Sequence, residues 1–260
     1  MTKILAVTNQ KGGVGKTTTA VNLAASLAAA KQRVLLIDLD PQGNATMGSG
    51  IDKRDLQASI YEVLLGSKTI AEARTHSDAG KYDLLPANRD LAGAEIELVD
   101  ISQREMRLRD AIKLVSGEYD FVLIDCPPAL NLLTLNGLCA AKSVMIPMQC
   151  EYYALEGLSD LVNTIRKVRA NLNPELEIEG LLRTMFDPRN ALAQQVSDQL
   201  EEHFGNKVYR TVIPRNVRLA EAPSFGVPVL YHDKLSKGTQ AYLALAGELL
   251  NNAAQPAASA

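Results

Sequence analysis

The chain has 260 residues, of which 47% are hydrophobic, so it is long enough to bury a large core in one domain. Its net charge of −3 argues against a strongly basic protein that coats nucleic acid with its whole surface, and leaves room only for a local basic patch. The three cysteines lack metal or redox spacing, and the sequence shows no signal peptide and no apolar run of roughly 20 residues. These features predict a cytoplasmic protein without a membrane span.

Short β-rich runs alternate with helical stretches, which is typical of a mostly parallel, twisted sheet with helices on both faces. The predicted strands are 3–9, 33–40, 82–87, 121–127, 143–149, 178–186 and 206–214. The clearest predicted helices are 17–31 and 236–251. Residues 50–80 are hard to interpret: 55–66 looks helical, and the rest fits either a lid or surface loops. We expect a single domain over 1–251 and a disordered tail over 252–260.

The stretch "NQKGGVGKTT" (9–18) follows the first strand and opens the first helix. Glycines let the backbone approach an anion, and the N–H groups of the loop and helix start surround phosphate oxygens. Lys16 would reach the phosphates and the Thr17 hydroxyl would ligate Mg²⁺. The sequence therefore predicts an α/β P-loop NTPase, against the alternative of a plain glycine-rich turn. The predicted nucleotide-binding residues of the loop are Lys11, Gly12, Gly13, Val14, Gly15, Lys16, Thr17 and Thr18.

The loop also departs from the usual P-loop pattern, because Gln10 stands where the first glycine belongs and Lys11 is an additional lysine. From spacing alone, Lys11 is best interpreted as a solvated surface residue.

Carboxylates follow two of the apolar strands. Asp125 ends "FVLID", and Asp38 and Asp40 end "LLIDLD". Strand carboxyl ends share one edge of an open α/β sheet, where ligands bind. Residues two apart in an extended segment point the same way, so Asp38 and Asp40 would both face the nucleotide. A single aspartate at a strand end is more often a turn or helix cap, but three beside a phosphate loop are harder to explain in that way. Asp125 stands where a Walker-B aspartate would hold Mg²⁺.

With these motifs in place, the chain resembles the ParA/MinD group of deviant-Walker ATPases, and most of all the chromosomal ParA (Soj) proteins. The matching stretches are "KGGVGKTT" (11–18), "LLIDLDPQGNAT" (35–46), "YDFVLIDCPP" (119–128) and "VIPRNVRLAEAPSFG" (212–226). The resemblance implies ATP and Mg²⁺ as ligands, and slow ATP hydrolysis that a partner stimulates. It also implies that two protomers sandwich two ATP molecules, with Lys11 reaching the partner's phosphates.

Further roles are implied by position. Lys11, Lys16 and Asp40 would be catalytic, with Asp40 positioning the attacking water. Asp38 and Asp125 would lie with Thr17 near Mg²⁺. Pro214, Arg215 and Asn216 would contact the adenine, with Met185 and Phe186 nearby. Without the resemblance, 214–216 would be interpreted as an ordinary turn.

The resemblance also implies nonspecific DNA binding by the ATP-bound dimer, a ParB-type partner at a centromere-like DNA site, and nucleoid association. Residues 207–218 carry four basic residues and no acidic one: Lys207, Arg210, Arg215 and Arg218. Arg189 and Arg218 fit the DNA-contact role by position. Scattered arginines are as often solvated surface.

Several alternatives are weighed against this interpretation. A MinD-like protein would end in a basic amphipathic helix for the membrane, but no basic residue follows Lys237. The cysteine spacing gives little support to a cluster-bridging iron protein. A relative that positions another cargo, a metabolic P-loop ATPase and a scaffold that does not hydrolyse ATP remain alternatives.

Overall fold

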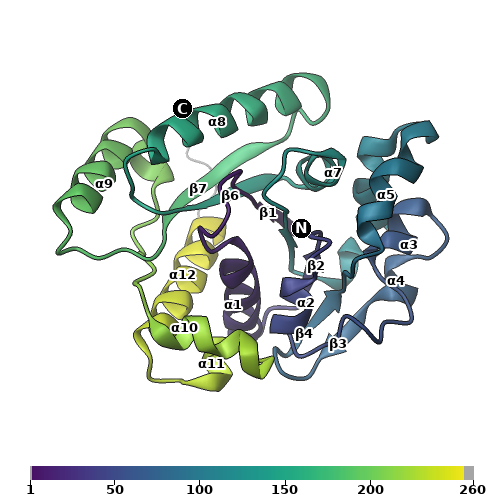
Figure 1. Cartoon of the computed structure of the whole chain (residues 1–260), viewed down its shortest axis with the longest axis horizontal. Coiled ribbons are helices and arrows are strands. Elements are labelled where there is room, and N and C mark those ends of the chain that lie inside the picture. Colours follow the sequence, from purple (N-terminus) through teal and green to yellow (C-terminus); the bar gives the residue numbers. More distant parts are fainter. Residues whose placement is uncertain (1, 255–260) are drawn as a thin grey trace.

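The computed structural model describes residues 2–254. They form a seven-stranded sheet with helices on both faces (Figure 1). Its strands are β1 (Lys3–Val7), β2 (Val34–Asp38), β3 (Thr75–Ser77), β4 (Tyr82–Leu85), β5 (Phe121–Asp125), β6 (Ser143–Met148) and β7 (Glu177–Arg183). Their spatial order is β3-β4-β2-β5-β1-β6-β7. The pairing of β3 with β4 is antiparallel and the other pairings are parallel, so the predicted fold class is confirmed.

Both sheet faces are covered because successive strand residues alternate between two apolar clusters. In β1, Leu5 and Val7 belong to one cluster and Ala6 to the other. The first cluster is covered by α1 (Lys16–Ala29), α2 (Asn44–Gly48), α10 (Val217–Glu221), α11 (Val229–His232) and α12 (Lys237–Ala254). The second is covered by α3 (Ile60–Leu65), α4 (Ile70–Ala73), α5 (Leu91–Glu97), α6 (Arg107–Lys113), α7 (Leu132–Ala140), α8 (Ala154–Asn171) and α9 (Ala191–Phe204). Figure 1 shows α1 and α12 packed side by side.

The strand register brings the predicted site residues to one edge. Asp125, the last residue of β5, pairs in register with Val7 of β1 and with Asp38 of β2. The loop that leads from β1 into α1 therefore starts beside both carboxylates. These strands lie in the middle of the sheet, where their carboxyl ends form the ligand-binding edge of an open α/β fold.

The strand predicted at 206–214 is not a strand. Among the described residues, the segment runs beside β7 and makes only two isolated bridges, Leu181 of β7 with Val208 and Phe186, beyond β7, with Pro214. Side chains take the backbone groups that a strand would pair: the Arg183 guanidinium donates to the Tyr209 carbonyl at 2.8 Å. Glu248 of α12 accepts from the N–H groups of Arg210 at 2.8 Å and of the next residue at 3.0 Å.

Residues 50–80 contain α3, α4 and β3, so only the core of the helix predicted at 55–66 is present. Both helices, α3 and α4, begin with a capping box, Ser59 with Glu62 and Thr69 with Glu72. The last helix, α12, includes 252–254 of the predicted tail, and 255–260 lie outside the described residues. None of the helices described has the length and apolar character to cross a bilayer.

Candidate nucleotide and magnesium site

The loop 9–15 is held from two strands, and its glycines adopt backbone conformations that other residues avoid. Gly13 has φ of +74° and Gly15 of +87°, which is the left-handed region. Asn9 anchors the loop to β6 by donating to the Pro147 carbonyl at 2.8 Å. Thr184, just after β7, donates its hydroxyl proton to the Val14 carbonyl at 2.8 Å. A Cβ on Gly12 would meet open space, so the loop leaves room for an anion.

The two lysines of the loop differ in burial and direction. Lys16 is buried, and its Nζ donates to the Lys11 carbonyl at 3.1 Å, inside its own loop. Burial lowers the pKa of Lys16, while the carboxylates of Asp125 and Asp40 partly offset that effect. Lys11 is about half exposed, and its Nζ forms an ion pair with Glu151, beyond the end of β6. Only Lys16 is therefore placed to meet a phosphate on its own protomer.

A cavity of about 570 Å³ opens at this edge of the sheet. It is lined by Gly12, Gly13, Gly15, Lys16, Thr17, Thr18, Asp40, Gln42, Asn44, Pro128, Thr184, Met185, Ile213, Pro214, Arg215, Asn216, Leu219, Ala220 and Tyr242. Most predicted nucleotide-binding residues are thus brought together. Lys11 and Val14 do not line the cavity, and the side chain of Val14 is buried although it belongs to the loop.

The three predicted carboxylates have different surroundings. Asp38 is fully buried and accepts hydrogen bonds of 2.8 Å from both the N–H and the hydroxyl of Thr46. Asp40 lines the cavity, and its carboxylate accepts from the Gln42 N–H at 2.9 Å. Asp40 thus lies at the cavity while Asp38 turns inward to Thr46, and the facing of both carboxylates toward a nucleotide stays a prediction.

Asp125 is fully buried, and neither of its carboxylate oxygens has a hydrogen-bond partner among the described residues. Burial, and then the charge of the neighbouring Asp38, raise the pKa of Asp125 well above its ordinary value. The pKa of Asp38 is raised mainly by burial as well, against the hydrogen bonds from Thr46. A buried carboxylate without a partner is costly unless a cation balances it.

These residues fit Mg²⁺ better than a metal held by protein alone. Within 2–254, no group of three or more His, Cys, Asp or Glu side chains is arranged to hold a metal ion. Mg²⁺ usually keeps several waters and binds through one or two carboxylates plus substrate phosphates. The Thr17 hydroxyl at the cavity and the unpartnered oxygens of Asp125 suit that partial donor set.

The predicted adenine-contact loop, Pro214 to Asn216, forms the far wall of the cavity. Met185 lines the cavity as well and has a positive φ of +50°, which is uncommon for a residue with a side chain. Phe186 does not line it; the guanidinium of Arg183 lies over its ring, 5.9 Å from the centroid.

The basic residues predicted to contact DNA are on the surface, and the two arginines singled out by position carry carboxylate partners. Arg189 is paired with Asp187, with an N–O distance of 2.7 Å, and its side chain is 88% exposed. Arg218 contacts Glu221 at 2.8 Å and Asp233 at 3.3 Å. Lys207 and Arg210 are exposed near α12, and Arg215 lines the cavity.

Sequence reasoning did not assign the residues that support the site from a distance. Thr46 lies in the quoted stretch 35–46, and Thr184 follows the end of a strand. The positions of both residues in the sequence could therefore have indicated that they lie near the site. Glu151 follows β6 in the same way, but nothing in the sequence indicates that it pairs with Lys11.

Comparisons with known proteins agree with this geometry. The family model described as AAA domain matches residues 2–178. The chromosome partitioning protein ParA of Myxococcus xanthus is 54% identical over 248 residues, which are 95% of this chain and 88% of that protein. The sporulation initiation inhibitor protein Soj of Bacillus subtilis is 54% identical over 252 residues, 97% of this chain and 100% of that protein.

Solved structures share the fold. Cobyrinic acid a,c-diamide synthase from Mycobacterium smegmatis, with bound ATP analog and magnesium, superimposes with a TM-score of 0.85 at 41% identity, covering 97% of this chain and 96% of that one. The cell division ATPase MinD of Pyrococcus furiosus has a TM-score of 0.80 at 24% identity, covering 97% and 100%, and that likeness concerns the fold alone. The chain belongs to the ParA/Soj family of P-loop partition ATPases.

Proposed function

We propose that the chain binds Mg²⁺ and ATP at the cavity, dimerises in the ATP state, and in that state binds DNA without sequence preference. Hydrolysis, stimulated by a ParB-type partner bound to a centromere-like DNA site, releases the dimer. The protein would thereby act in the cytoplasm at the nucleoid, as a switch that partitions DNA.

The observation that carries the proposal is the divergence of the two lysines. Lys16 is buried and directed into its own loop, whereas Lys11 lies outside the cavity on the exposed face. A lysine in a phosphate loop that does not reach its own phosphate site is suited to meet the phosphates of a second protomer. Dimerisation and ATP binding would then be one linked equilibrium, because each stabilises the other.

The remaining roles follow from placement. Mg²⁺, when bound, supplies positive charge at the phosphates; Thr17 and Asp125 would hold it, with Asp38 beside them. Asp40, the carboxylate that lines the cavity, would position the attacking water. Pro214, Arg215 and Asn216 would contact the base.

The hydrolysis step is tested by Asp40→Ala. We expect ATP binding and dimerisation to persist while phosphate release falls by at least about 100-fold, since general-base or water-positioning groups contribute about 10²–10⁴. Phosphate release at the wild-type rate would refute the assignment of Asp40.

The whole proposal is tested by DNA retention of the wild-type chain with ATP, with ADP and without nucleotide, across a salt series. We expect retention with ATP alone, lost as salt rises, because phosphate contacts release counterions. Equal retention in all three states, or none in any, would overturn the DNA-partition proposal and favour another cargo or a metabolic ATPase. Adding a ParB-type protein with its DNA site should accelerate release of the ATP-bound protein.

A further inference from the structure

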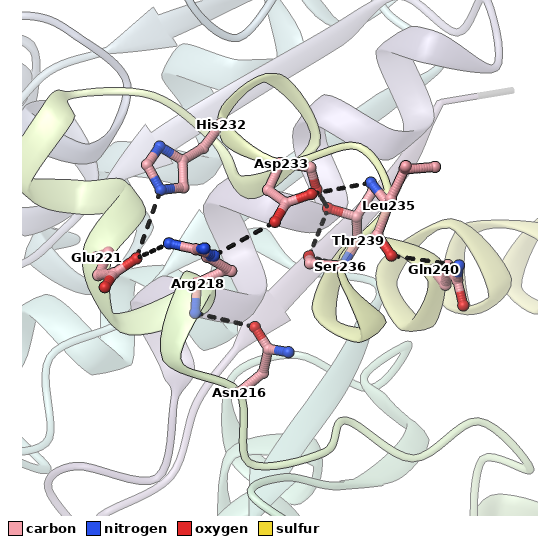
Figure 2. Close-up of polar contacts among 9 residues, drawn as sticks. All are labelled: Asn216, Arg218, Glu221, His232, Asp233, Leu235, Ser236, Thr239 and Gln240. Atoms are coloured by element: carbon pink, nitrogen blue, oxygen red, sulfur yellow. Dashed lines mark hydrogen bonds and ion pairs between the residues drawn. The ribbon is translucent and has the colours of Figure 1, made fainter.

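Arg218, at the exposed start of α10, is held by carboxylates from two elements (Figure 2). Its Nη1 donates to Glu221 Oε2 at 2.8 Å, within α10. Its Nε lies 3.3 Å from Asp233 Oδ2, in the turn that joins α11 to α12. The side chain is 48% exposed, so the guanidinium is accessible to solvent and yet already balanced by two negative charges.

The two carboxylates are themselves held in place. Asp233 Oδ1 accepts from the Leu235 N–H at 3.1 Å, and the Asp233 carbonyl accepts from the Thr239 hydroxyl at 2.7 Å (Figure 2). Glu221 Oε2 also lies 3.7 Å from His232 Nε2. Asp233 is therefore fixed to the first turn of α12, and the contact with Arg218 bridges α10 and α12.

The same helix adjoins the cavity. Asn216, which caps α10 by accepting the Arg218 N–H at 3.0 Å, lines the cavity, as do Leu219 and Ala220. Leu219 packs directly on Gly238 of α12, where a Cβ would come within 2.7 Å of the Leu219 side chain. A ligand that moves α10 against α12 would change the distance between Arg218 and Asp233.

Carboxylates and phosphates present the same kind of acceptor to a guanidinium, and both can bind it through two oxygens. Glu221 and Asp233 occupy two of the five N–H donors of the Arg218 guanidinium and neutralise its charge, so a DNA phosphate that approaches Arg218 must compete with them. Exposed ion pairs contribute little net free energy, so such a contact weakens phosphate binding without preventing it.

We propose that Glu221 and Asp233 are internal competitors for a DNA phosphate at Arg218, and that they lower DNA affinity in the nucleotide-free chain. This inference rests on the proposed function, because it takes the DNA backbone as the partner of this surface. Nucleotide binding at Asn216 and Leu219 would weaken the contact by shifting α10 relative to α12.

The test titrates nucleotide-free protein with nonspecific duplex DNA at very low salt, where the weak residual affinity that is too low for retention can be measured. Asp233→Asn and Glu221→Gln keep the shape and the acceptor oxygens but remove one charge each. We expect either variant to bind about two- to fivefold more tightly than wild type, the range that loss of an exposed ion pair allows. With ATP, variants and wild type should differ less.

The matched control is Asp110→Asn. Asp110 forms an exposed pair with Lys113 three residues on, in α6, which covers the other apolar cluster. It changes the net charge equally but does not contact Arg218, so we expect a smaller effect than in the two carboxylate variants. An equal gain in the control would overturn the proposal, because net charge alone would then explain it.

A double variant shows whether the gain in DNA affinity acts through Arg218 or arises elsewhere in the protein. Adding Arg218→Ala to Asp233→Asn should abolish the gain in affinity, and a gain that persists would overturn the role of Arg218. Unchanged affinity in both carboxylate variants would overturn the competitor role even if wild type retains DNA with ATP. Failure of wild type to retain DNA with ATP would instead overturn the proposed function.

Discussion

The nucleotide edge of the sheet and the surface that carries Arg189 and Arg218 differ in how their charges are balanced. At the edge, Asp125 is fully buried next to the equally buried Asp38, and its carboxylate accepts no hydrogen bond from any residue that the structure describes. On the surface, Arg189 and Arg218 are exposed and each is matched by carboxylates. Folding alone leaves the carboxylates of the edge only partly balanced, by Lys16, whereas the surface arginines are balanced by their own carboxylates. A cation is therefore favoured at the edge, whereas an anion that binds the surface arginines must compete with their carboxylates.

The largest effect is expected from Lys16→Ala, which removes the cation that the edge already provides. We expect ATP affinity to fall about 100-fold, because charged hydrogen bonds to phosphate in a buried site are lost. Binding of a fluorescent ATP analogue measures it. Unchanged affinity in a variant that melts normally without ligand would contradict the assignment.

Asp125→Asn tests the imbalance at the edge through stability. The folded-state pKa of Asp125 is raised, so its charge destabilises the ligand-free fold at neutral pH. Asp125→Asn should therefore have a higher free energy of unfolding than wild type at pH 7. Bound nucleotide should stabilise the wild-type fold more in the presence of Mg²⁺ than in its absence. Asp125→Asn should lose this additional stabilisation by Mg²⁺.

The gain should shrink as pH falls through the raised pKa of the folded state and vanish below the ordinary carboxyl pKa of about 3.9, where both folded and unfolded chains carry a protonated Asp125. Urea unfolding at several pH values measures this. A variant that is less stable than wild type at pH 7 would show that the charge of Asp125 is compensated in the free protein.

Lys11→Ala separates the two lysines of one loop. We expect the ATP-dependent dimer to weaken by about tenfold, the effect of losing one charge-assisted contact, while ATP binding to the monomer is retained. Analytical ultracentrifugation with a non-hydrolysable ATP analogue measures the dimer. The matched variant Glu151→Gln releases Lys11 from its ion pair and should leave the dimer at least as tight. A normal dimer in Lys11→Ala would refute the cross-subunit role.

The smallest effect is expected from Arg189→Ala, because this arginine is highly exposed and tied to Asp187 two residues away. DNA affinity of the ATP state should fall about twofold at low salt, with a salt slope smaller by about one. Identical slopes in variant and wild type would mean that Arg189 is not a phosphate contact.

The sequence by itself determined the loop, its two lysines and the strands that end in aspartate. Those signals are local: a few glycines, a Gly-Lys-Thr sequence and apolar runs buried on both faces specify a strand, a phosphate loop and a helix. The order of these elements was enough to place the P-loop, Asp38 and Asp125 at one edge, because parallel strands share their carboxyl ends.

Only the tertiary structure decided which partner each polar group finds. Residues 206–214 have the composition of a strand. However, the side chains of Arg183 and Glu248, which belong to other elements, form hydrogen bonds with backbone groups of this segment. Asp38 turns to Thr46 of the element that follows it, while Lys11 meets Glu151 and Arg218 meets Asp233 from elements further along the chain. Hydrogen bonds and ion pairs of this kind depend on distances that folding sets, so no local pattern encodes them.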